Sequence, residues 1–374
     1  KIGTNCIERG VCQVSSQETR TFSPIESIYD MSGGPLDDRR SLLMAFAIKN
    51  LDISSKKNLC FGMAVVDTSS SKLTLSQFVD DSYFSRLRTF LSIYNVKKII
   101  VESSSLNPAL KSLFKSFQCI IETLRRSSEF PSSPQDAVQK FLASSKLKPT
   151  DIPGPLAHRF EYLSESSYKV KVDSELAITS LGALSWYLGY HKIDEEIFAM
   201  KNFHDYLPID SGASDNIASS QTHMVMDSAV IQSLSLISSE DTKPAGNAKR
   251  SKSNSLLDVI DFTQSFKGKD IIKKWLIYPL YKYEDIVRRQ EIIRHLIKCE
   301  IIDRVDFKML PNYTRLLSVA NSLAAKSHDH PEYQAVLFCL STINKRKANI
   351  LLLLLNGFMD LSKKFEKLKS VIMR

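Results

Sequence analysis

Residues 59–81, LCFGMAVVDTSSSKLTLSQFVDD, decide the fold of the first half of the chain. The apolar run at 63–66 and the alternating apolar positions at 73–78 are both typical of β-strands. A polar turn at 69–72 separates them, so this stretch predicts a β-hairpin. The preceding LLMAFAI, at 42–48, predicts one more strand of the same sheet.

Helices and strands alternate after the hairpin. Apolar residues from Phe84 to Tyr94 recur at helical spacing. The segments 96–103, VKKIIVES, and 119–124, CIIETL, are short and apolar enough to be buried strands. Between them lies 107–117, NPALKSLFKSF, whose Asn-Pro start favours a helix. The order strand–hairpin–helix–strand–helix–strand predicts a three-layer α/β domain with a mixed sheet.

The composition changes between residues 145 and 172, and from about residue 173 we expect an almost wholly helical chain. Leucines on one side of 174–190 predict an amphipathic helix. Residues 255–280 predict two helices around a glycine-containing turn or kink, the second stopped at Pro279. Apolar positions of 282–298 recur at helical spacing and predict another helix.

The last segment, 333–374, predicts one long helix with a polar interruption at Asn356–Gly357. Its leucine run at 350–355 is far shorter than the ~20 apolar residues of a membrane span, so we expect it to be the buried stripe of this helix. The fold class predicted for the whole chain is therefore an α/β domain followed by a mainly α-helical domain.

The composition allows several domains and excludes few functions. The 374 residues are 43% hydrophobic and 24% charged, as in soluble globular proteins. A net charge of +9 is compatible with a nucleic-acid partner but does not establish one. The six cysteines form no C-x-x-C pair, and His328 and His330 have no third ligand at a suitable spacing. The sequence therefore indicates neither a zinc site nor a disulfide framework.

Residues 255–280, SLLDVIDFTQSFKGKDIIKKWLIYPL, followed by 283–297, YEDIVRRQEIIRHLI, resemble the core signature of the eukaryotic MutS family of DNA mismatch-repair proteins. Two positions depart from the family pattern, with Lys267 before the glycine and Asp270 after the lysine. The signature residues that we interpret as structural are Leu256, Asp261, Gly268, Lys269, Trp275 and Pro279.

The resemblance covers nearly the whole chain in order. Residues 64–102 are similar to the family's connector domain, which is RNase H-like in fold. The sequence around 174–234 is similar to the MutS homologue six branch of the family. The resemblance implies three parts: 1–22 as the tail of the mismatch-binding domain, 23–160 as the connector, and 161–374 as an incomplete core and lever domain.

The resemblance also implies the function of a parent protein. Such a protein binds mismatched double-stranded DNA in the nucleus as a heterodimer with MutS homologue two, and it hydrolyses ATP with Mg²⁺. The chain contains no G-x-x-x-x-G-K-[ST] motif, and none of its phenylalanines is followed two residues later by Glu. We therefore expect this fragment to hold no catalytic, cofactor or metal site and to couple the two functional ends.

Two alternatives stand beside this interpretation. Asp67, Asp80, Asp81 and Glu102 lie at predicted strand ends, where an RNase H-like nuclease would hold two metal ions. These carboxylates could equally be solvated strand ends. The other alternative is a helical scaffold without a DNA role, because basic runs such as those at 249–252 and 267–274, and Arg288-Arg289, are often only solvated faces.

The aromatic residues on the predicted helices have a simple interpretation. Trp186, Tyr187 and Tyr190 are expected to pack in a core and not to stack on bases. Trp275 is likewise expected to anchor two helices. We assign no residue as a DNA ligand from the sequence.

Overall fold

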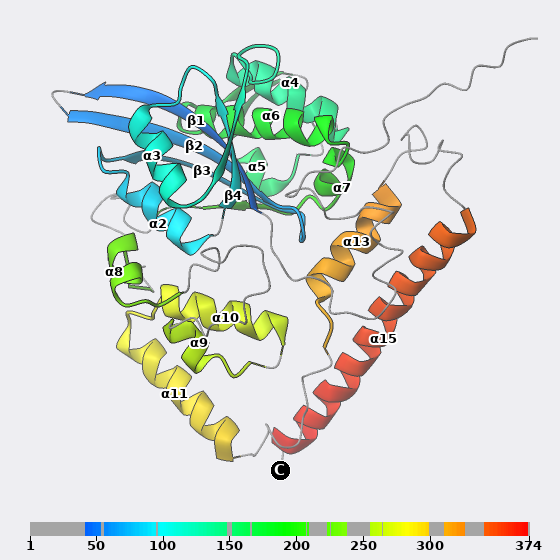
Figure 1. The fold of residues 1–374 in the computed structure, drawn as a ribbon. Helices are drawn as coiled ribbons and strands as arrows, with labels where there is room; N and C mark the ends of the chain where they lie inside the picture. The colour runs from blue at the N-terminus through cyan, green and yellow to red at the C-terminus, as the bar shows by residue number, and fades with distance from the viewer. Residues whose placement is uncertain are drawn as a thin grey trace, which may run out of the picture.

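The computed structural model describes residues 42–53, 56–94, 96–147, 152–164, 167–206, 208, 223–224, 226–237, 255–263, 265–298, 310–325 and 340–372. The expectations for residues 1–22, for His328 and His330, and for most of the polar segment 210–254 lie outside these ranges. Figure 1 shows a sheet covered by helices and, below it, a separate group of helices.

The sheet is mixed and has the order β5-β4-β1-β2-β3-β8. The long hairpin strands β2 (Lys56–Asp67) and β3 (Lys72–Asp80) pair antiparallel, and β1 (Leu42–Ile53) pairs antiparallel with β2. On the other side of β1, β4 (Val96–Glu102) and β5 (Ile120–Leu124) run parallel to it. The hairpin and the strands predicted around it are confirmed.

Helices cover both faces of the sheet (Figure 1). Alternate residues of β1 point to opposite faces, so Met44 and Phe46 pack with one set of helices and Leu43 and Ala45 with the other. The first face is covered by α2 (Ser85–Ile93) and α3 (Pro108–Ser116). The second is covered by α4 (Pro134–Ser145) and α6 (Glu175–Tyr190). This arrangement is the predicted three-layer α/β architecture.

Helix α6 lies very close to the sheet because two glycines leave room for it. A Cβ atom on Gly62 of β2 would collide with the backbone of Leu176. A Cβ atom on Gly182 of α6 would lie 2.5 Å from the Cα of Ala137 in α4. The hydroxyl of Ser180 donates to the carbonyl of Gly62 over 2.8 Å, which fixes the contact.

The α/β layers continue beyond the change in composition. After α5 (Gly154–Ala157), the hairpin of β6 (Phe160–Ser164) and β7 (Ser167–Val170), and the 3₁₀ turn η3 (Val172–Ser174), helix α6 joins the sheet. Helix α7 (Asp194–Ala199) follows, and β8 (Phe203–Asp205) adds a parallel edge strand beside β3. We call residues 42–206 the α/β unit. The sequence interpretation assigned 161–206 to the helical part, whereas these residues complete the layers of the sheet.

The remaining described elements form what we call the helical segment, residues 223–372. It consists of α8 (Ser228–Ser233), α9 (Leu256–Ile260), α10 (Phe266–Ile277), α11 (Tyr283–Lys298), α13 (Tyr313–Ala325) and α15 (Leu340–Ile372). Asp227, Ser255 and Ser265 cap α8, α9 and α10, each accepting from a backbone N–H three residues later.

Three details of the helical segment differ from the predictions. Gly268 lies in the first turn of α10 and not in the turn before it, because Ser265 caps the helix. Helix α15 runs through Asn356–Gly357 without interruption. Of the apolar run 350–355, Leu354 is buried, but Leu351, Leu352, Leu353 and Leu355 are half exposed or more. The described helices include none with the length and apolarity of a membrane span.

Candidate coupling interface

The α/β unit contacts the helical segment through an apolar cluster at the end of α2. Ile93 of α2 packs with Ile231 of α8, with Leu236 just after it, and with Ile277 of α10. Tyr94 and Tyr278 pack against this cluster from the two sides. We call these residues the first joint. Burial of such side chains contributes roughly 25 cal/mol per Å² of apolar surface, so the joint favours one fixed arrangement of the helices.

Polar contacts make the first joint specific. The Tyr94 and Tyr278 side chains meet at this cluster. Burial raises the pKa of both phenols, so both stay neutral at physiological pH. The backbone N–H of Ser228, at the start of α8, donates to the Thr89 hydroxyl over 3.2 Å.

Aromatic rings extend the joint toward the edge of the sheet. The ring of Tyr206, just after β8, lies 5.0 Å from Phe90 and 6.2 Å from Tyr94. The backbone N–H of Tyr206 donates to Leu75 of β3, which holds the ring in position. Aromatic pairs at these distances add directional packing to simple burial.

A buried carboxylate positions α2, the helix that carries the first joint. The Asp80 side chain accepts backbone N–H groups of Asp81, Arg86 and Leu87 at 2.9, 3.1 and 3.0 Å. These groups lie around the N-terminus of α2, where the helix dipole favours a negative charge. Burial nevertheless raises the pKa of Asp80, with a smaller contribution from the neighbouring Asp81.

A second contact joins the tip of the hairpin to α13. The hydroxyl oxygens of Ser71 and Ser318 lie 2.8 Å apart, and both residues are buried. Ser71 has a positive φ of 52° in the turn between β2 and β3, which aims this turn at α13. Helix α13 also contacts α7 of the α/β unit. We call the Ser71–Ser318 pair together with the α7–α13 contact the second joint.

Helix α13 in turn holds the long helix α15. The Tyr313 hydroxyl donates to the carbonyl of Gly357 over 2.7 Å, and its ring stacks on Phe358 at 5.2 Å. A Cβ atom at Gly357 would lie 3.0 Å from Pro311, so glycine permits this close approach. A continuous set of contacts therefore leads from the hairpin through α13 to α15, as the side-by-side helices in Figure 1 illustrate.

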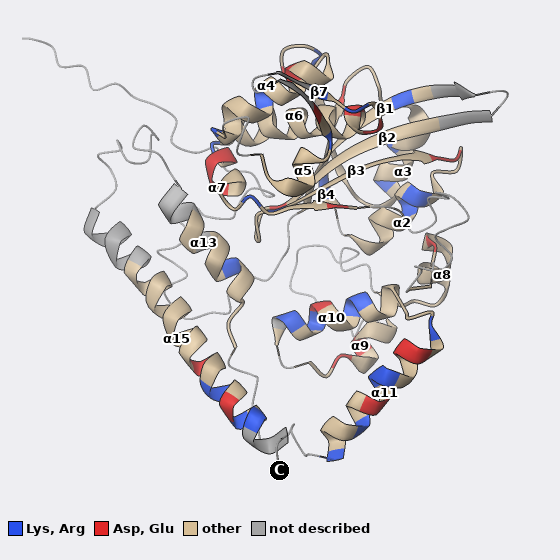
Figure 2. Ribbon diagram, turned by 180° about the vertical axis from the view of Figure 1, so that it is seen from behind, with Lys and Arg blue, Asp and Glu red and all other residues tan. Residues whose placement is uncertain are grey.

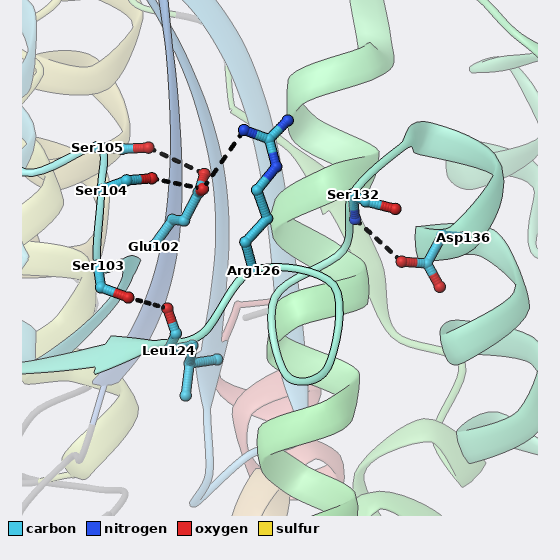
Figure 3. Close-up of polar contacts among 8 residues, drawn as sticks. All are labelled: Glu102, Ser103, Ser104, Ser105, Leu124, Arg126, Ser132 and Asp136. Atoms are coloured by element: carbon cyan, nitrogen blue, oxygen red, sulfur yellow. Dashed lines mark hydrogen bonds and ion pairs between the residues drawn. The ribbon is translucent and has the colours of Figure 1, made fainter.

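The four carboxylates of the nuclease alternative do not form a metal site. Asp67 accepts from Ser69 and Ser70 of its own turn, and Asp81 accepts from Ser85 and its neighbours. Glu102 accepts from Ser104 and Ser105, and its carboxylate lies 3.7 Å from Arg126 (Figure 3). Within the described ranges there is no group of three potential ligands that could hold a metal ion.

Charge on the helical segment is mixed. Figure 2 shows Lys and Arg side by side with Asp and Glu along α11 and α15, while α10 is mainly basic. On α10, Lys269 lies 4.0 Å from Asp261. Alternating signs along α11 and α15 are typical of solvated helix faces, so no nucleic-acid interface is assigned to them.

Two family models match the chain: MutS domain II over residues 41–197 and MutS domain III over residues 229–373. These adjacent domains of one family together span most of the chain. The chain belongs to the MutS family. The α/β unit contains the domain II match, and the helical segment contains nearly all of the domain III match. The two joints therefore lie between two MutS domains.

The relatives that the chain resembles are mismatch repair proteins. The chain is 27% identical to the DNA mismatch repair protein Msh6 of Homo sapiens over 372 residues, which is 94% of this chain and 26% of that protein. It is 26% identical to Msh6 of Gallus gallus over 374 residues, covering 94% of this chain and 27% of that protein. MutS of Thermotoga sp. is 30% identical over 140 residues, or 37% of this chain and 14% of that protein.

These relatives bear out the MutS resemblance and the predicted fold class. They also show that the chain spans about a quarter of the length of the Msh6 proteins. The nuclease and the DNA-independent scaffold find no support among them.

The residues that we interpreted from the sequence as a structural signature lie around α9 and α10. Asp261 ends α9, and its carboxylate accepts from the N–H and hydroxyl of Thr263. Gly268 approaches Thr263 closely, since a Cβ atom there would lie 3.1 Å from the Thr263 Cβ. The Asp261–Lys269 ion pair then links the end of α9 to α10. The structure thus brings Asp261, Gly268 and Lys269 together.

The other three signature residues lie apart from that turn. Leu256 is 41% exposed, and the neighbouring Leu257 is the buried leucine of α9. Trp275 is 44% exposed, and the Arg289 guanidinium of α11 lies 4.1 Å above its ring. It therefore links two helices at the surface and not in a core as expected. The Pro279 carbonyl accepts from the N–H of Met224 over 2.8 Å.

The expectation for the other aromatic residues is only partly met. Tyr187 is buried, and Trp186, also on α6, is partly buried against the core. Tyr190 is 59% exposed and stacks on Trp186 with a centroid distance of 5.7 Å. The last turn of α6 therefore carries a small surface pair and not a fully buried stripe.

Sequence reasoning missed the residues of both joints. Tyr94 was recognised as part of a helical stripe, but nothing in its spacing pointed to Tyr278, far along the chain. Ser71 and Ser318 carry no pattern that distinguishes them from surface serines. The end of α10 offered one usable signal. Two large apolar side chains, Ile277 and Tyr278, directly precede Pro279, which stops the helix, and large apolar side chains at a helix end tend to pack against another element.

Proposed function

We propose that this chain is the coupling segment of a MutS-type DNA mismatch-repair protein. Its α/β unit serves as the connector, and its helical segment forms part of the core and lever region. The segment carries movement between a mismatch-binding end and an ATPase end that both lie outside these residues. No step of the chemistry is assigned to the chain itself.

One observation supports this proposal above the others. The α/β unit and the helical segment are held together by two separate joints, one where α2 meets α8 and the end of α10, and one where the hairpin tip meets α13. Two separate contacts restrict the relative rotation of two bodies to the axis that joins them, whereas a single contact allows rotation in every direction about it. A displacement of α15 or α10 therefore moves the sheet as well.

The signature residues support the same proposal as structural residues. The Asp261–Lys269 pair and the Gly268 contact orient α10, which carries Ile277 and Tyr278 into the first joint. We propose that the connector extends from residue 23 to about residue 206, because α6 and β8 complete its layers. The core and lever part then begins after residue 206 and not at 161.

The parent protein is proposed from the relatives. It binds mismatched double-stranded DNA in the nucleus as a heterodimer with a second MutS homologue, MutS homologue two. It hydrolyses ATP with Mg²⁺ at a site outside the present residues. The similarity to Msh6 over 94% of the chain supports this assignment.

The test uses the complete protein assembled with its MutS partner. Replacing Ile277 with Ala removes apolar contact from the first joint, while Ile297→Ala truncates an exposed residue of α11 as a matched control. We expect I277A to slow mismatch-provoked ADP release by roughly two- to thirtyfold, the range for coupling changes of about 0.5–2 kcal/mol. Mismatch affinity and ATPase activity without DNA should stay unchanged. Equal ADP release in I277A and the unaltered protein would refute the proposal.

A further inference from the structure

A short loop between β5 and α4 carries two arginines directly before a pair of serines. Its sequence, RRSSEF at 125–130, places Arg125 and Arg126 three and two residues before Ser128. Both arginine side chains are exposed, at 85% and 66%, and both serines are exposed. Acidic pockets of basophilic protein kinases recognise this charge pattern before the acceptor hydroxyl.

We propose that Ser128 is a phosphorylation site for a basophilic protein kinase. In the reaction, the Ser128 Oγ forms a bond to the γ-phosphorus of Mg-ATP, and the bond from that phosphorus to the β–γ bridging oxygen breaks. ADP leaves, and the hydroxyl proton passes to the catalytic base of the kinase. Nothing in this step depends on the coupling function of the chain.

The turn that presents Ser128 is closed by backbone hydrogen bonds, and its last residue, Phe130, is buried in the apolar core. The N–H groups of Glu129 and Phe130 donate to the Arg125 carbonyl at 3.1 and 2.8 Å, and the Ser127 N–H donates to the Phe130 carbonyl at 2.8 Å. Residues 125–128 are exposed, so this part of the turn can open locally and enter a kinase cleft while Phe130 stays in the core.

Existing contacts disfavour two other described residues that have an arginine three positions before them. Ser318 follows Arg315 at this spacing, but it is buried against Ser71 in the second joint. Thr89 follows Arg86, but its hydroxyl donates to Ser85 within α2 and accepts from Ser228. Exposure together with the arginine pair therefore favours Ser128 within the described part of the chain.

A phosphate on Ser128 would change the contacts of Arg126. The Arg126 side chain now extends from the loop to Glu102, at the carboxyl end of β4 (Figure 3). Glu102 also accepts from the hydroxyls of Ser104 and Ser105 at 2.6 and 2.9 Å. A phosphate carries about −1.5 to −2 charges and binds guanidinium more strongly than a carboxylate does.

Both positive and negative side chains surround the loop, so some would attract a phosphate on Ser128 and others would repel it. Lys140 of α4 donates to the Ser127 carbonyl over 3.4 Å, so a third cation lies beside the loop. Glu129 pairs with Arg125, and Asp136 pairs with Lys140. The phosphate would thus meet three cations that already have singly charged partners, and we infer that it draws Arg126 away from Glu102.

The test uses the 374-residue chain, Mg-ATP and the catalytic subunit of cAMP-dependent protein kinase as the basophilic probe. Modified positions are identified by mass spectrometry, because 249–253, KRSKS, also place basic residues before serines. We expect phosphate on Ser128 and none on Ser132, which is exposed in the same loop but follows Glu129 and Phe130. Arg125→Gln and Arg126→Gln should each lower kcat/KM at Ser128 about tenfold or more, since each removes a charge contact to the kinase.

An unmodified Ser128 beside modified serines at 249–253 in the same reaction would overturn the proposal. A kcat/KM at Ser128 that is the same in the two arginine variants as in the unaltered chain would overturn it as well. Hydrogen exchange tests whether Arg126 leaves Glu102 after phosphorylation. Phosphorylation should speed amide exchange at Ser103–Ser105, and unphosphorylated R126Q should reproduce this change. Unchanged exchange after full modification would show that Arg126 stays with Glu102.

Discussion

The hydroxyl oxygens of Ser71 and Ser318 lie 2.8 Å apart across a separation of 247 residues in the sequence. One belongs to the tip of a hairpin in the α/β unit and the other to α13 of the helical segment. Both side chains are buried, so each hydroxyl depends on the other for its hydrogen bond. This pair ties together two MutS domains at a point away from the first joint.

Truncating one serine of this pair should destabilise the chain. We expect Ser318→Ala to lower the free energy of unfolding by about 1–3 kcal/mol, because the buried Ser71 hydroxyl loses its partner. The double variant S71A/S318A should lose less than the sum of the two single variants. Chemical denaturation measures these differences. Ser76→Ala is the matched control, since its buried hydroxyl has no hydrogen-bond partner among the described residues and its removal should cost little.

The tyrosine pair of the first joint should show a measurable coupling energy. Tyr94→Phe and Tyr278→Phe each remove one hydroxyl of the pair, and each should lower the free energy of unfolding by about 1 kcal/mol. In a double-mutant cycle the two effects should not add, because the two side chains meet in the same joint. Tyr83→Phe, at an exposed residue before α2, serves as the control. Strictly additive effects would show that the hydroxyls do not interact.

Glycine at position 62 should be essential for the close packing of α6 against the sheet. Gly62→Ala places a methyl group against the backbone of Leu176, and backbone cannot rotate away as a side chain can. We expect a loss of about 3 kcal/mol or more in the free energy of unfolding, at the upper end of overpacking effects. Gly154→Ala should be nearly neutral because, in the described part of the chain, its added Cβ would meet nothing within 4 Å beyond its own helix backbone and chain neighbours. Similar stabilities for the two variants in thermal denaturation would contradict the close packing of α6.

Asp80 and Asp81 should influence stability with opposite dependence on pH. Burial raises the pKa of Asp80 above its ordinary value of 3.8 in the folded chain. Its stabilising contribution is therefore complete below pH 3.8 and is lost as the pH rises through the folded pKa. For Asp81, hydrogen bonds from Ser85 and Tyr83 outweigh the effect of burial and lower the pKa, so its contribution is present above pH 3.8 and is lost as the pH falls.

Comparison with Asp80→Asn and Asp81→Asn isolates these two contributions. The stability difference between the unaltered chain and D80N should fall with rising pH in the acidic range. The corresponding difference for D81N should rise over the same range. Urea unfolding at a series of acidic pH values provides the measurement. If the stability differences for D80N and D81N changed with pH in the same direction, the two carboxyls would not have the opposite pKa shifts described here.

Local pattern was enough to predict the strands and most helices. The alternation at 73–78 and the Asn107-Pro108 helix start depend only on neighbouring residues, and both are confirmed by β3 and α3. The place of α6 could not be derived in this way. Its helical period was visible, but a helix can cover a sheet or another helix with the same apolar residues.

The joints depend on long-range contacts that no local pattern encodes. The three-residue strand β8 is held by pairing with β3 and by little in its own sequence. The leucines at 351–353 were expected to be buried, yet the described neighbours of α15 cover mainly the side of Leu354 and Gly357. Sequence therefore identified the elements and the family, whereas the contacts between the two domains required the structure.

The distance between the α/β unit and α15 tests the central claim most directly. Spin labels at the exposed Lys111 of α3 and Lys363 of α15 report this distance by pulsed electron paramagnetic resonance. We predict one narrow distance distribution for the unaltered chain and a clearly broader one when Ile277→Ala and Ser318→Ala weaken both joints. A broad distribution in the unaltered chain, or an unchanged narrow one in the double variant, would contradict the claim that these joints hold the two domains as one body.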